Sequence, residues 1–338
     1  MKIKKVLVLG AGVSGLTTAL KLLQAGHVVT IWSREAVGQF APTSMSAYAV
    51  WSPCRMDNDS RVEDWCFATL DEFARLSLLP ESGVRMLPLT DLQTTENVPW
   101  YAERALNRLP YYDQGGPNQF GEDKVAQDNS LLPPPYSAAH HLKQVAVIDP
   151  CTYLPWLARQ ITSLAGSFAQ KEVECLTDCP LEYEAIVNCT GLGARQLCQD
   201  QTLQPLPMQI VQIEPNSTLT RVVFDQSGPN AQAHVVPHLN RVTLGATLGA
   251  LGSESLPEDA ANSAGILART ANILPGFSAG PEHITRTISC LRPKRPTPRV
   301  ELELIEGRTI VHNYGHDGKG YIVSWAVAAA IVEMLSKN

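Results

Sequence analysis

Apolar and polar positions change period twice within the first 35 residues of the chain. Lys5–Leu9 is a short apolar run of β-forming residues, and apolar residues then recur at helical spacing through Val13–Leu23. Gly26 follows as the residue expected to end that helix, and Val28–Trp32 is a second β-rich run. The pattern predicts a strand–helix–strand unit with parallel strands and a right-handed crossover.

Similar elements return in the middle and at the end of the chain. Residues 150–166 are predicted to be helical, with Asp149 as the N-cap before a proline. Glu184–Cys189 has the pattern of a buried strand, and Tyr321–Leu335 that of an apolar, alanine-rich helix. These elements extend the α/β pattern of the N-terminus.

The segments between them differ in character. Residues 56–142 are rich in Pro, Asn, Asp and Gln and lack a regular period. From 205 to 250 turn residues separate β-rich runs, which predicts an antiparallel sheet from Met208–Ile213, Thr218–Phe224, His234–Val236 and Arg241–Leu244. We therefore predict an α/β fold in which a Rossmann-like nucleotide-binding domain, discontinuous in sequence, is interleaved with a mainly antiparallel β substrate domain. The predicted ranges are 1–55, 143–200 and 286–338 for the first domain, and 56–142 and 201–285 for the second.

Composition and charge narrow the class of protein. The 44% hydrophobic content of the 338 residues suffices for a sizeable core and excludes a disordered chain. A net charge of −6 offers no basic footprint, so we expect no nucleic-acid partner. Glycines interrupt the apolar run after Met1–Lys5, which argues against a signal peptide. Ile322–Leu335 is shorter than the roughly 20 residues that span a bilayer, so we expect a cytoplasmic protein with no membrane partner.

The eight cysteines form no C-x-x-C pair and have no histidine at zinc-ligand spacing. We expect free thiols and no metal site.

The segment Gly10-Ala-Gly12-Val-Ser-Gly15 lies between the first predicted strand and the first predicted helix. Gly10 permits a tight turn, Gly12 lets the backbone approach a pyrophosphate, and Gly15 lets the helix pack closely on the strand. The helix N-terminus adds free N–H groups and a positive dipole end. In this context dinucleotide binding explains the three glycines better than a plain turn does.

The residues after the second strand bear on which dinucleotide binds. Glu35 lies twenty residues after Gly15, where an acidic residue holds ribose hydroxyls, whereas the neighbouring Arg34 would suit a 2′-phosphate. This motif alone leaves FAD, NAD and NADP open.

A second glycine-rich segment, Ile310–Gly320, precedes the C-terminal helix and favours a flavin. Its backbone N–H groups and the helix dipole would stabilise negative charge on a reduced flavin ring. A nicotinamide enzyme has no need of such a loop at its C-terminus.

A third segment, Cys290–Arg299, is basic and rich in proline. Prolines stiffen the backbone, and a fixed Arg292 or Arg295 could bind a carboxylate bidentately. On composition alone, a solvated basic loop is the simpler interpretation of both arginines.

These motifs together resemble the D-amino-acid oxidase / D-aspartate oxidase family of flavoenzymes over nearly the whole length. The segments that carry the resemblance are Val6–Ala19, Pro42–Pro53, Ile186–Gly191, His234–Pro237, Val242–Gly245, Leu291–Pro296 and His312–His316.

The resemblance implies non-covalent FAD, hydride transfer from the substrate Cα to flavin N5, hydrolysis of the released imine, and reoxidation by O2 to hydrogen peroxide. Arg292 matches the arginine that binds the substrate carboxylate, while Arg295 keeps the solvated-loop interpretation. The predicted catalytic residues are Arg292, His234 and Gly318. The predicted FAD-binding residues are Gly10, Ala11, Gly12, Val13, Ser14, Gly15, Arg34, Glu35, Thr43, Ser44, Val50, Trp51, Val173, Thr190, Gly191, Gly315, Asp317, Gly318, Lys319, Gly320, Tyr321 and Ile322. The expected partners are a small amino acid and O2, and the protein is expected to be a monomer or homodimer.

The chain also departs from the family pattern around the substrate. His234 stands where the family has a tyrosine, Asp317 replaces a glycine of the flavin loop, and Tyr48-Ala49 replaces an Ala-Gly pair. His234 is either a buried strand residue or a pocket residue that, if protonated, would favour an acidic side chain such as that of D-aspartate or D-glutamate. A glycine or secondary-amine oxidase, a biosynthetic tailoring enzyme and a flavin dehydrogenase that does not use O2 remain alternatives to a D-amino-acid oxidase. A flavoprotein retained only for binding is the least consistent with Arg292.

Overall fold

The computed structural model describes residues 3–56, 58–95, 100–101, 104, 132–225, 228–255 and 258–337. The irregular segment predicted for 56–142 therefore lies in large part outside the described residues. The helices and strands of the described chain are, in order, β1 (Lys5–Leu9), α1 (Val13–Gln24), β2 (Val28–Ser33), α2 (Pro42–Met45), α3 (Arg61–Leu76), β3 (Val84–Gln93), β4 (Ala138–Ile148), α6 (Pro150–Ser163), β5 (Ser167–Gln170), β6 (Ala185–Asn188), α7 (Ala194–Leu197), β7 (Gln204–Ile213), β8 (Val222–Asp225), β9 (Ala233–Pro237), β10 (Val242–Leu248), α8 (Ala260–Ile273), β11 (Ile284–Ile305), β12 (Arg308–His316) and α9 (Gly320–Ser336).

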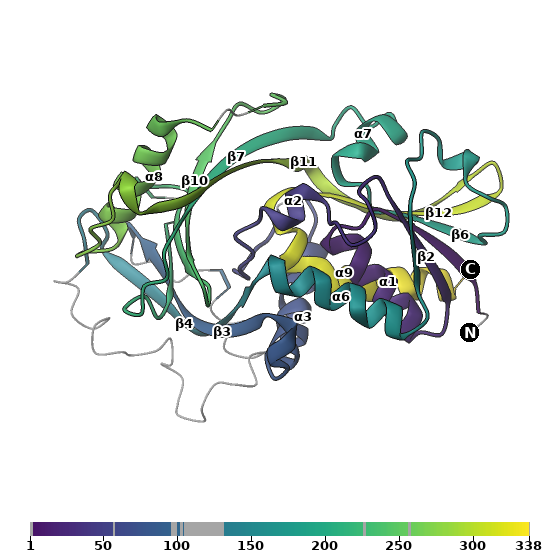
Figure 1. Cartoon of the computed structure of the whole chain (residues 1–338), viewed down its shortest axis with the longest axis horizontal. Helices are drawn as coiled ribbons and strands as arrows, with labels where there is room; N and C mark the ends of the chain where they lie inside the picture. Colours follow the sequence, from purple (N-terminus) through teal and green to yellow (C-terminus); the bar gives the residue numbers. More distant parts are fainter. Residues whose placement is uncertain are drawn as a thin grey trace.

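A single sheet of twelve strands runs through the described residues in the order β4-β3-β8-β9-β10-β7-β11-β12-β6-β1-β2-β5 (Figure 1). One end is parallel: β12, β6, β1, β2 and β5 all run in the same direction. The predicted strand–helix–strand unit is confirmed as β1, α1 and β2, and Gly26 ends α1 with a φ of +88°. The mixed α/β class of the fold is likewise confirmed.

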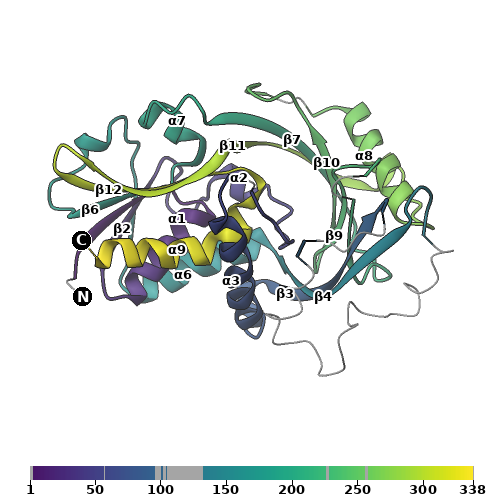
Figure 2. The same cartoon turned by 180° about the vertical axis from the view of Figure 1, so that it is seen from behind.

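Helices α1, α6 and α9 lie together on one side of the parallel strands (Figures 1 and 2). The alternation of β1 explains this layer, because Val6 and Val8 pack with the helices while Leu7 and Leu9 pack on the opposite face. The predicted helix near 150–166 is α6, and the Asp149 side chain accepts a hydrogen bond from the N–H of Cys151, as its N-cap role requires. The chain termini lie close together at this end of the molecule.

The other end of the sheet is mainly antiparallel. The four predicted β-rich runs correspond to β7, β8, β9 and β10, whose neighbouring strands pair antiparallel in the order β8-β9-β10-β7. Helix α8 covers this part through Ile266, Leu267 and Ile273, in a second cluster of buried apolar side chains. The prediction of an antiparallel sheet is therefore confirmed.

Strand β11 joins the two ends, because it pairs with β7 on one edge and with β12 on the other. The interpretation of Cys290–Arg299 as a loop is wrong, since these residues lie inside β11. Pro296 and Pro298 are tolerated there because the pairing with β12 shifts register between Lys294 and Arg299, and Pro293 lies opposite Pro205 of β7.

Two of the predicted domain boundaries fall inside strands, at 142/143 in β4 and at 285/286 in β11. Helix α3, assigned by sequence to the substrate domain, packs against α9 and shares the main apolar cluster with the nucleotide-binding helices. The division of the chain into two units stays a prediction, and α3 belongs by packing to the first of them.

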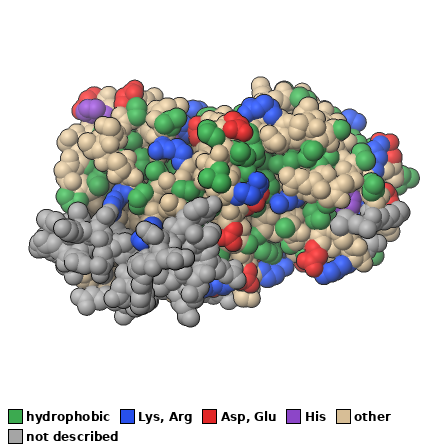
Figure 3. All heavy atoms as spheres, turned by 90° about the horizontal axis from the view of Figure 1, so that it is seen from below, with side chains coloured by type: hydrophobic (Ala, Val, Ile, Leu, Met, Phe, Trp, Pro, Cys, Tyr) green, Lys and Arg blue, Asp and Glu red, His purple; other side chains and the backbone are tan. Residues whose placement is uncertain are grey.

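Asp317–Ser336 is long and apolar enough to cross a membrane, by length and composition alone. The run Ile322–Leu335 considered in the sequence is shorter and does not reach that length. Half of this window is buried inside the protein, and α9 packs against α1 and α3 as a core helix does. On the face drawn in Figure 3, basic and acidic side chains are interspersed over the described surface. All eight cysteines are free.

Candidate active site

A cavity of about 750 Å³ opens at the carboxyl ends of the parallel strands β1, β2 and β6. It extends past α2 to Met208 on β7, to Ser289–Pro293 on β11, and to the turn between β12 and α9. Carboxyl ends of parallel strands are where α/β sheets place their ligands. The cavity therefore touches both the nucleotide-binding part and the antiparallel part of the sheet.

Most of the residues predicted to bind the cofactor line this cavity. They are Gly10, Ala11, Gly12, Val13, Ser14, Arg34, Glu35, Thr43, Ser44, Val50, Val173, Thr190, Gly191, Gly315, Asp317, Gly318, Gly320 and Tyr321. The exceptions among the predicted set are Gly15, Trp51, Lys319 and Ile322, which are not part of the lining.

From the sequence, Trp51 is predicted to bind FAD, but the structure places its side chain in the core and not in the cavity lining. Its side chain is fully buried, its indole N–H donates to the carbonyl of Cys66 over 2.8 Å, and its ring packs against Phe67. These contacts make Trp51 a core residue.

The turn between β1 and α1 has the close packing that its glycines predict. Gly10 adopts a φ of +104°, and a Cβ on it would lie 2.5 Å from the carbonyl oxygen of Cys189. A Cβ on Gly15 would lie 1.9 Å from the carbonyl oxygen of Gly10, so only glycine lets α1 approach β1. Ser44 accepts a hydrogen bond from the N–H of Val13, which ties α2 to the first turn of α1. The N-terminus of α1 is thereby fixed against the cavity wall.

Arg34 and Glu35 both line the cavity after the end of β2, but their exposure differs. The Arg34 side chain is 71% exposed and that of Glu35 only 19%, with 3.6 Å between the guanidinium and the carboxylate. The more enclosed carboxylate is therefore the better placed of the two to meet ribose hydroxyls.

Arg292 lies at the opposite part of the cavity, on β11. Its side chain is 14% exposed and crosses Gly318, where a Cβ would lie 2.4 Å from Nη2. Among the described residues, Nη1 has the sulfur of Met208 at 4.0 Å as its hydrogen-bond contact, and the buried Nε has no hydrogen-bond partner. A buried guanidinium with unused N–H groups is suited to an anionic ligand.

Asp317, in the short 3₁₀ turn Asp317–Lys319, contacts the same guanidinium. Its Oδ1 lies 2.8 Å from Nη2 of Arg292, and its Oδ2 lies 2.9 Å from Nζ of Lys294. Burial alone would raise the pKa of the Asp317 carboxyl, but Arg292, Lys319 and Lys294 outweigh it and hold the pKa below its usual range. The substitution of the family glycine thus adds a permanent negative charge beside Arg292.

His234 on β9 is buried and is not part of the cavity lining. Its ring packs against Tyr48, which does line the cavity, and against Phe224. Burial, with Arg292 and Arg269 nearby, lowers the pKa of His234 to about 3, so the imidazole is neutral. The expectation of a protonated imidazole that attracts an acidic substrate is wrong for this reason.

Several cavity residues carried no prediction from sequence. They are Tyr48, Lys171, Met208, Ser289, Asn313 and His316, among others. His316 ends the segment His312–His316 that carried the family resemblance, which is the one signal that could have singled it out. Met208 and Ser289 lie on strands whose pairing only the structure reveals.

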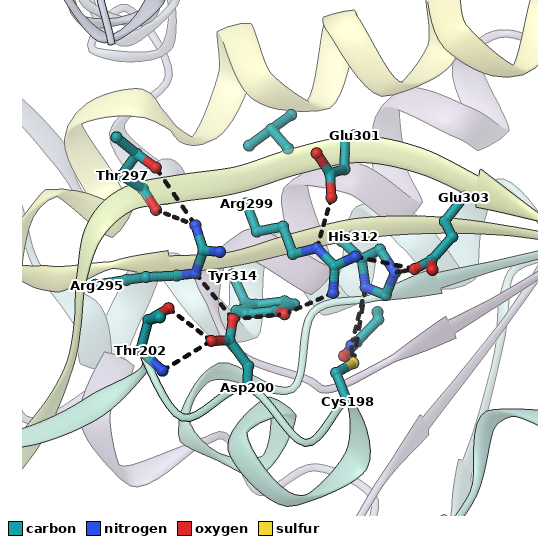
Figure 4. A network of polar contacts seen from close by, with 12 residues as sticks. Cys198, Asp200, Thr202, Arg295, Thr297, Arg299, Glu301, Glu303, His312 and Tyr314 are labelled. Atoms are coloured by element: carbon teal, nitrogen blue, oxygen red, sulfur yellow. Dashed lines mark hydrogen bonds and ion pairs between the residues drawn. The ribbon is translucent and has the colours of Figure 1, made fainter. Parts of the chain in front are cut away.

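A polar network next to the cavity fixes β11 and β12 to the segment after α7 (Figure 4). Asp200 accepts hydrogen bonds from Arg295 over 2.8 Å and from Tyr314 over 3.0 Å, and Arg299 donates to Tyr314. Burial would raise the pKa of Asp200, but the hydrogen bonds from Thr202, Arg295 and Tyr314 lower it to about 2. The interpretation of Arg295 as a solvated side chain is therefore wrong.

Residues 5–334 match the sequence family DAO, described as FAD dependent oxidoreductase. The chain belongs to this family. A D-amino-acid oxidase of Streptomyces coelicolor is 31% identical over 98% of this chain and 97% of its own length. A D-amino-acid oxidase of Rubrobacter xylanophilus is 30% identical over 96% and 94%. The solved glycine oxidase of Bacillus cereus shares the fold with a TM-score of 0.73 and 17% identity, over 99% of this chain and 95% of that one. The resemblance seen in the sequence is confirmed, and the chain is an FAD-dependent oxidoreductase.

The residues that line the cavity fit FAD. The glycine turn at residues 10–15 would hold the pyrophosphate, and Glu35 the ribose. Four buried polar atoms of the lining have no hydrogen-bond partner among the described residues: Ser289 Oγ, Arg292 Nε, His316 Nδ1 and Asp317 Oδ1, the last of which still forms the ion pair with Arg292. Such atoms are expected where a polar ligand completes the site. They lie at the part of the cavity where the flavin ring and the substrate would meet.

Proposed function

We propose that this DAO-family enzyme oxidises a D-amino acid at its Cα–N bond. The products are an imino acid, which hydrolyses to a 2-oxo acid and ammonia, and hydrogen peroxide from the reduction of O2. The observation that carries the proposal is the buried Arg292, with an unpartnered Nε, on the wall of the same cavity as the glycine turn. Similarity to D-amino-acid oxidases over almost the full length of both chains supports it.

The protein's part in this reaction is to bind, orient and enclose the substrate. Arg292 would receive the substrate carboxylate through its charge-assisted N–H groups, and Gly318 leaves the space in which the guanidinium lies. FAD, when bound, supplies the acceptor of the hydride. The reaction then needs a fixed substrate orientation and a neutral amine more than a general base.

A glycine or secondary-amine oxidase is the second candidate, and one observation favours it. Tyr48 replaces a small residue at the cavity wall, and its half-buried phenol lies close enough to Arg292 for that charge to act on its pKa, which burial raises. A bulky ring beside the carboxylate site would leave little room for a substrate side chain. Such a pocket would favour glycine, which has no side chain.

A substrate panel on the FAD-loaded enzyme tests these candidates. D-Alanine, larger D-amino acids, their L-enantiomers, glycine and sarcosine are mixed anaerobically with the enzyme, and bleaching of the flavin is followed before and after aeration. The proposal expects bleaching by D-amino acids and peroxide on aeration. Bleaching only by glycine or sarcosine would favour the second candidate, and bleaching without reoxidation by O2 would indicate a dehydrogenase. No bleaching by any compound would contradict both.

A further inference from the structure

The guanidinium assigned to the substrate carboxylate already holds a carboxylate of this chain. Nη2 of Arg292 lies 2.8 Å from Oδ1 of Asp317, and the Asp317 side chain is only 5% exposed. Its other oxygen, Oδ2, lies 2.9 Å from Nζ of Lys294. Asp317 therefore bridges two cations, Arg292 in the cavity wall and Lys294 outside the lining.

Because of the geometry of the guanidinium, Asp317 and a substrate carboxylate would compete for the same nitrogen of Arg292. A carboxylate binds a guanidinium bidentately through Nη1 and Nη2 or through Nε and Nη2, so Nη2 takes part in both arrangements. Within the part of the chain that the structure describes, Nε has no hydrogen-bond partner and Nη1 is within hydrogen-bond range of the Met208 sulfur alone. An entering carboxylate thus finds free donors on both sides of the one nitrogen that Asp317 contacts.

Asp317 is not needed to hold Arg292 in place. Arg292 lies within β11, its backbone is paired with Leu206 on β7, and its guanidinium rests on Gly318. Asp317 itself adopts a φ of +53°, a region that favours glycine, so its side chain is retained against a backbone preference.

Lys294 lowers the free-energy cost of separating Asp317 from Arg292. When Asp317 leaves Arg292, its second oxygen keeps the ammonium of Lys294, whose side chain is 43% exposed and can move with it. Displacing a buried carboxylate is costly when it leaves the charge without a partner. Asp317 avoids this cost because it keeps its ion pair with Lys294.

We propose that Asp317 is an internal competitor for Arg292, and that the substrate carboxylate binds by exchange with it while Lys294 retains Asp317. The inference rests on the proposed function, since it takes Arg292 as the carboxylate site. It also narrows the substrate class: the negative charge of Asp317 beside Arg292 disfavours a second carboxylate, so monocarboxylic amino acids are preferred over D-aspartate and D-glutamate.

Equilibrium binding of pyruvate, the 2-oxo acid expected from D-alanine, tests the exchange without turnover. It is measured by calorimetry on the FAD-loaded wild type, Asp317→Asn, Lys294→Met and Arg292→Ala. Asp317→Asn keeps the shape but removes the competing charge, so the Kd should fall about tenfold. Lys294→Met removes the second partner of Asp317, so the Kd should rise several-fold.

The matched control is Asp149→Asn. It breaks another enclosed ion pair, in which Oδ1 of Asp149 lies 2.7 Å from Nη2 of Arg241, and neither residue lines the cavity. Asparagine still caps α6, and the pyruvate Kd should not change. FAD content and Tm are recorded for each variant. If Asp317→Asn does not retain FAD, Asp317→Gly, which suits the φ of +53°, is measured in its place.

An unchanged or higher Kd in the Asp317 variant overturns the exchange, because a residue that only orients Arg292 would weaken binding when lost. An unchanged or lower Kd in Lys294→Met overturns it too. Arg292→Ala separates this failure from that of the proposed function. Pyruvate binding that survives without Arg292 would refute the carboxylate site itself.

Discussion

The ring of Tyr48 packs against the imidazole of His234, with 4.1 Å between the ring centroids. Tyr48 lines the cavity and His234 does not, so His234 touches the cavity wall through the ring of Tyr48, while its imidazole also lies near the Arg292 charge. The histidine therefore positions a pocket residue, and the chemistry of the pocket wall is that of a phenol, whose pKa is raised by burial.

His234 should make the protein less stable as the pH falls. Its pKa is about 3 in the folded protein and near 6.5 in the unfolded chain, so only the unfolded chain takes up a proton between these values. Stability is thus lost as the pH falls below 6.5, by roughly 1.4 kcal/mol at pH 5.5 from this group. Urea denaturation of wild type and His234→Gln at pH 7.5 and 5.5 measures the difference.

The variant should lose less stability than wild type between the two pH values, whatever its stability at pH 7.5. Its ranking of D-amino acids should stay that of wild type, since His234 does not line the cavity. A ranking that shifted toward or away from acidic substrates with pH in wild type alone would restore His234 to recognition.

Gly15→Ala should prevent FAD binding by disrupting the β1–α1 turn. A Cβ there would lie 1.9 Å from the carbonyl oxygen of Gly10, and because its two nearest atoms are both backbone, no flexible side chain can move aside. Gly265→Ala in α8 is the matched control, because the nearest atom to its Cβ would be Nη1 of Arg269 at 3.3 Å, the far end of a flexible side chain outside the cavity lining. FAD content after purification and Tm should both fall far more in Gly15→Ala. Equal FAD content in the two variants would contradict the role of this contact.

The local elements around the cofactor were predictable because their signals are local. β1, α1 and β2 follow from hydrophobic period and glycine punctuation, and α6 from its cap and proline. The resemblance to a known family correctly placed most of the predicted cofactor residues in the cavity lining. None of this required knowledge of which strands pair.

The parts that sequence misjudged depend on pairing and on burial. Cys290–Arg299 has the composition of a loop and became a strand because β7 and β12 flank it on both sides. Arg295 became part of a network because the fold brings Asp200 beside it. Trp51 and His234 lie outside the cavity lining because of their packing against Phe67 and Tyr48, which no local sequence pattern indicates.

Asp200→Asn should destabilise the protein at neutral pH and much less in acid. The folded pKa of about 2 lies below the unfolded value near 4, so the carboxylate contributes stability above pH 4 that is lost as the pH falls toward 2. The contribution at pH 7 is of order 2 kcal/mol. Chemical denaturation at pH 7 and pH 3 should show a difference between wild type and variant that shrinks in acid. Asp178→Asn, at an exposed position, is the control and should change stability by less than about 0.5 kcal/mol.

Arg292→Ala should abolish most activity while FAD stays bound, because Arg292 lies away from the glycine turn that holds the pyrophosphate. A charge-assisted carboxylate contact is worth roughly 1.5–3 kcal/mol, so kcat/KM should fall by about tenfold to several hundredfold. Arg292→Lys should restore only part of the activity, since a single ammonium cannot reproduce two parallel N–H donors and would itself pair with Asp317.

Arg295→Ala provides the comparison. Arg295 lies on the same strand but binds Asp200 outside the cavity lining, so its removal should lower Tm while KM changes little. Steady-state kinetics with D-alanine and flavin absorbance measure both quantities, and wild-type kinetics in Arg292→Ala would remove this residue from the substrate site.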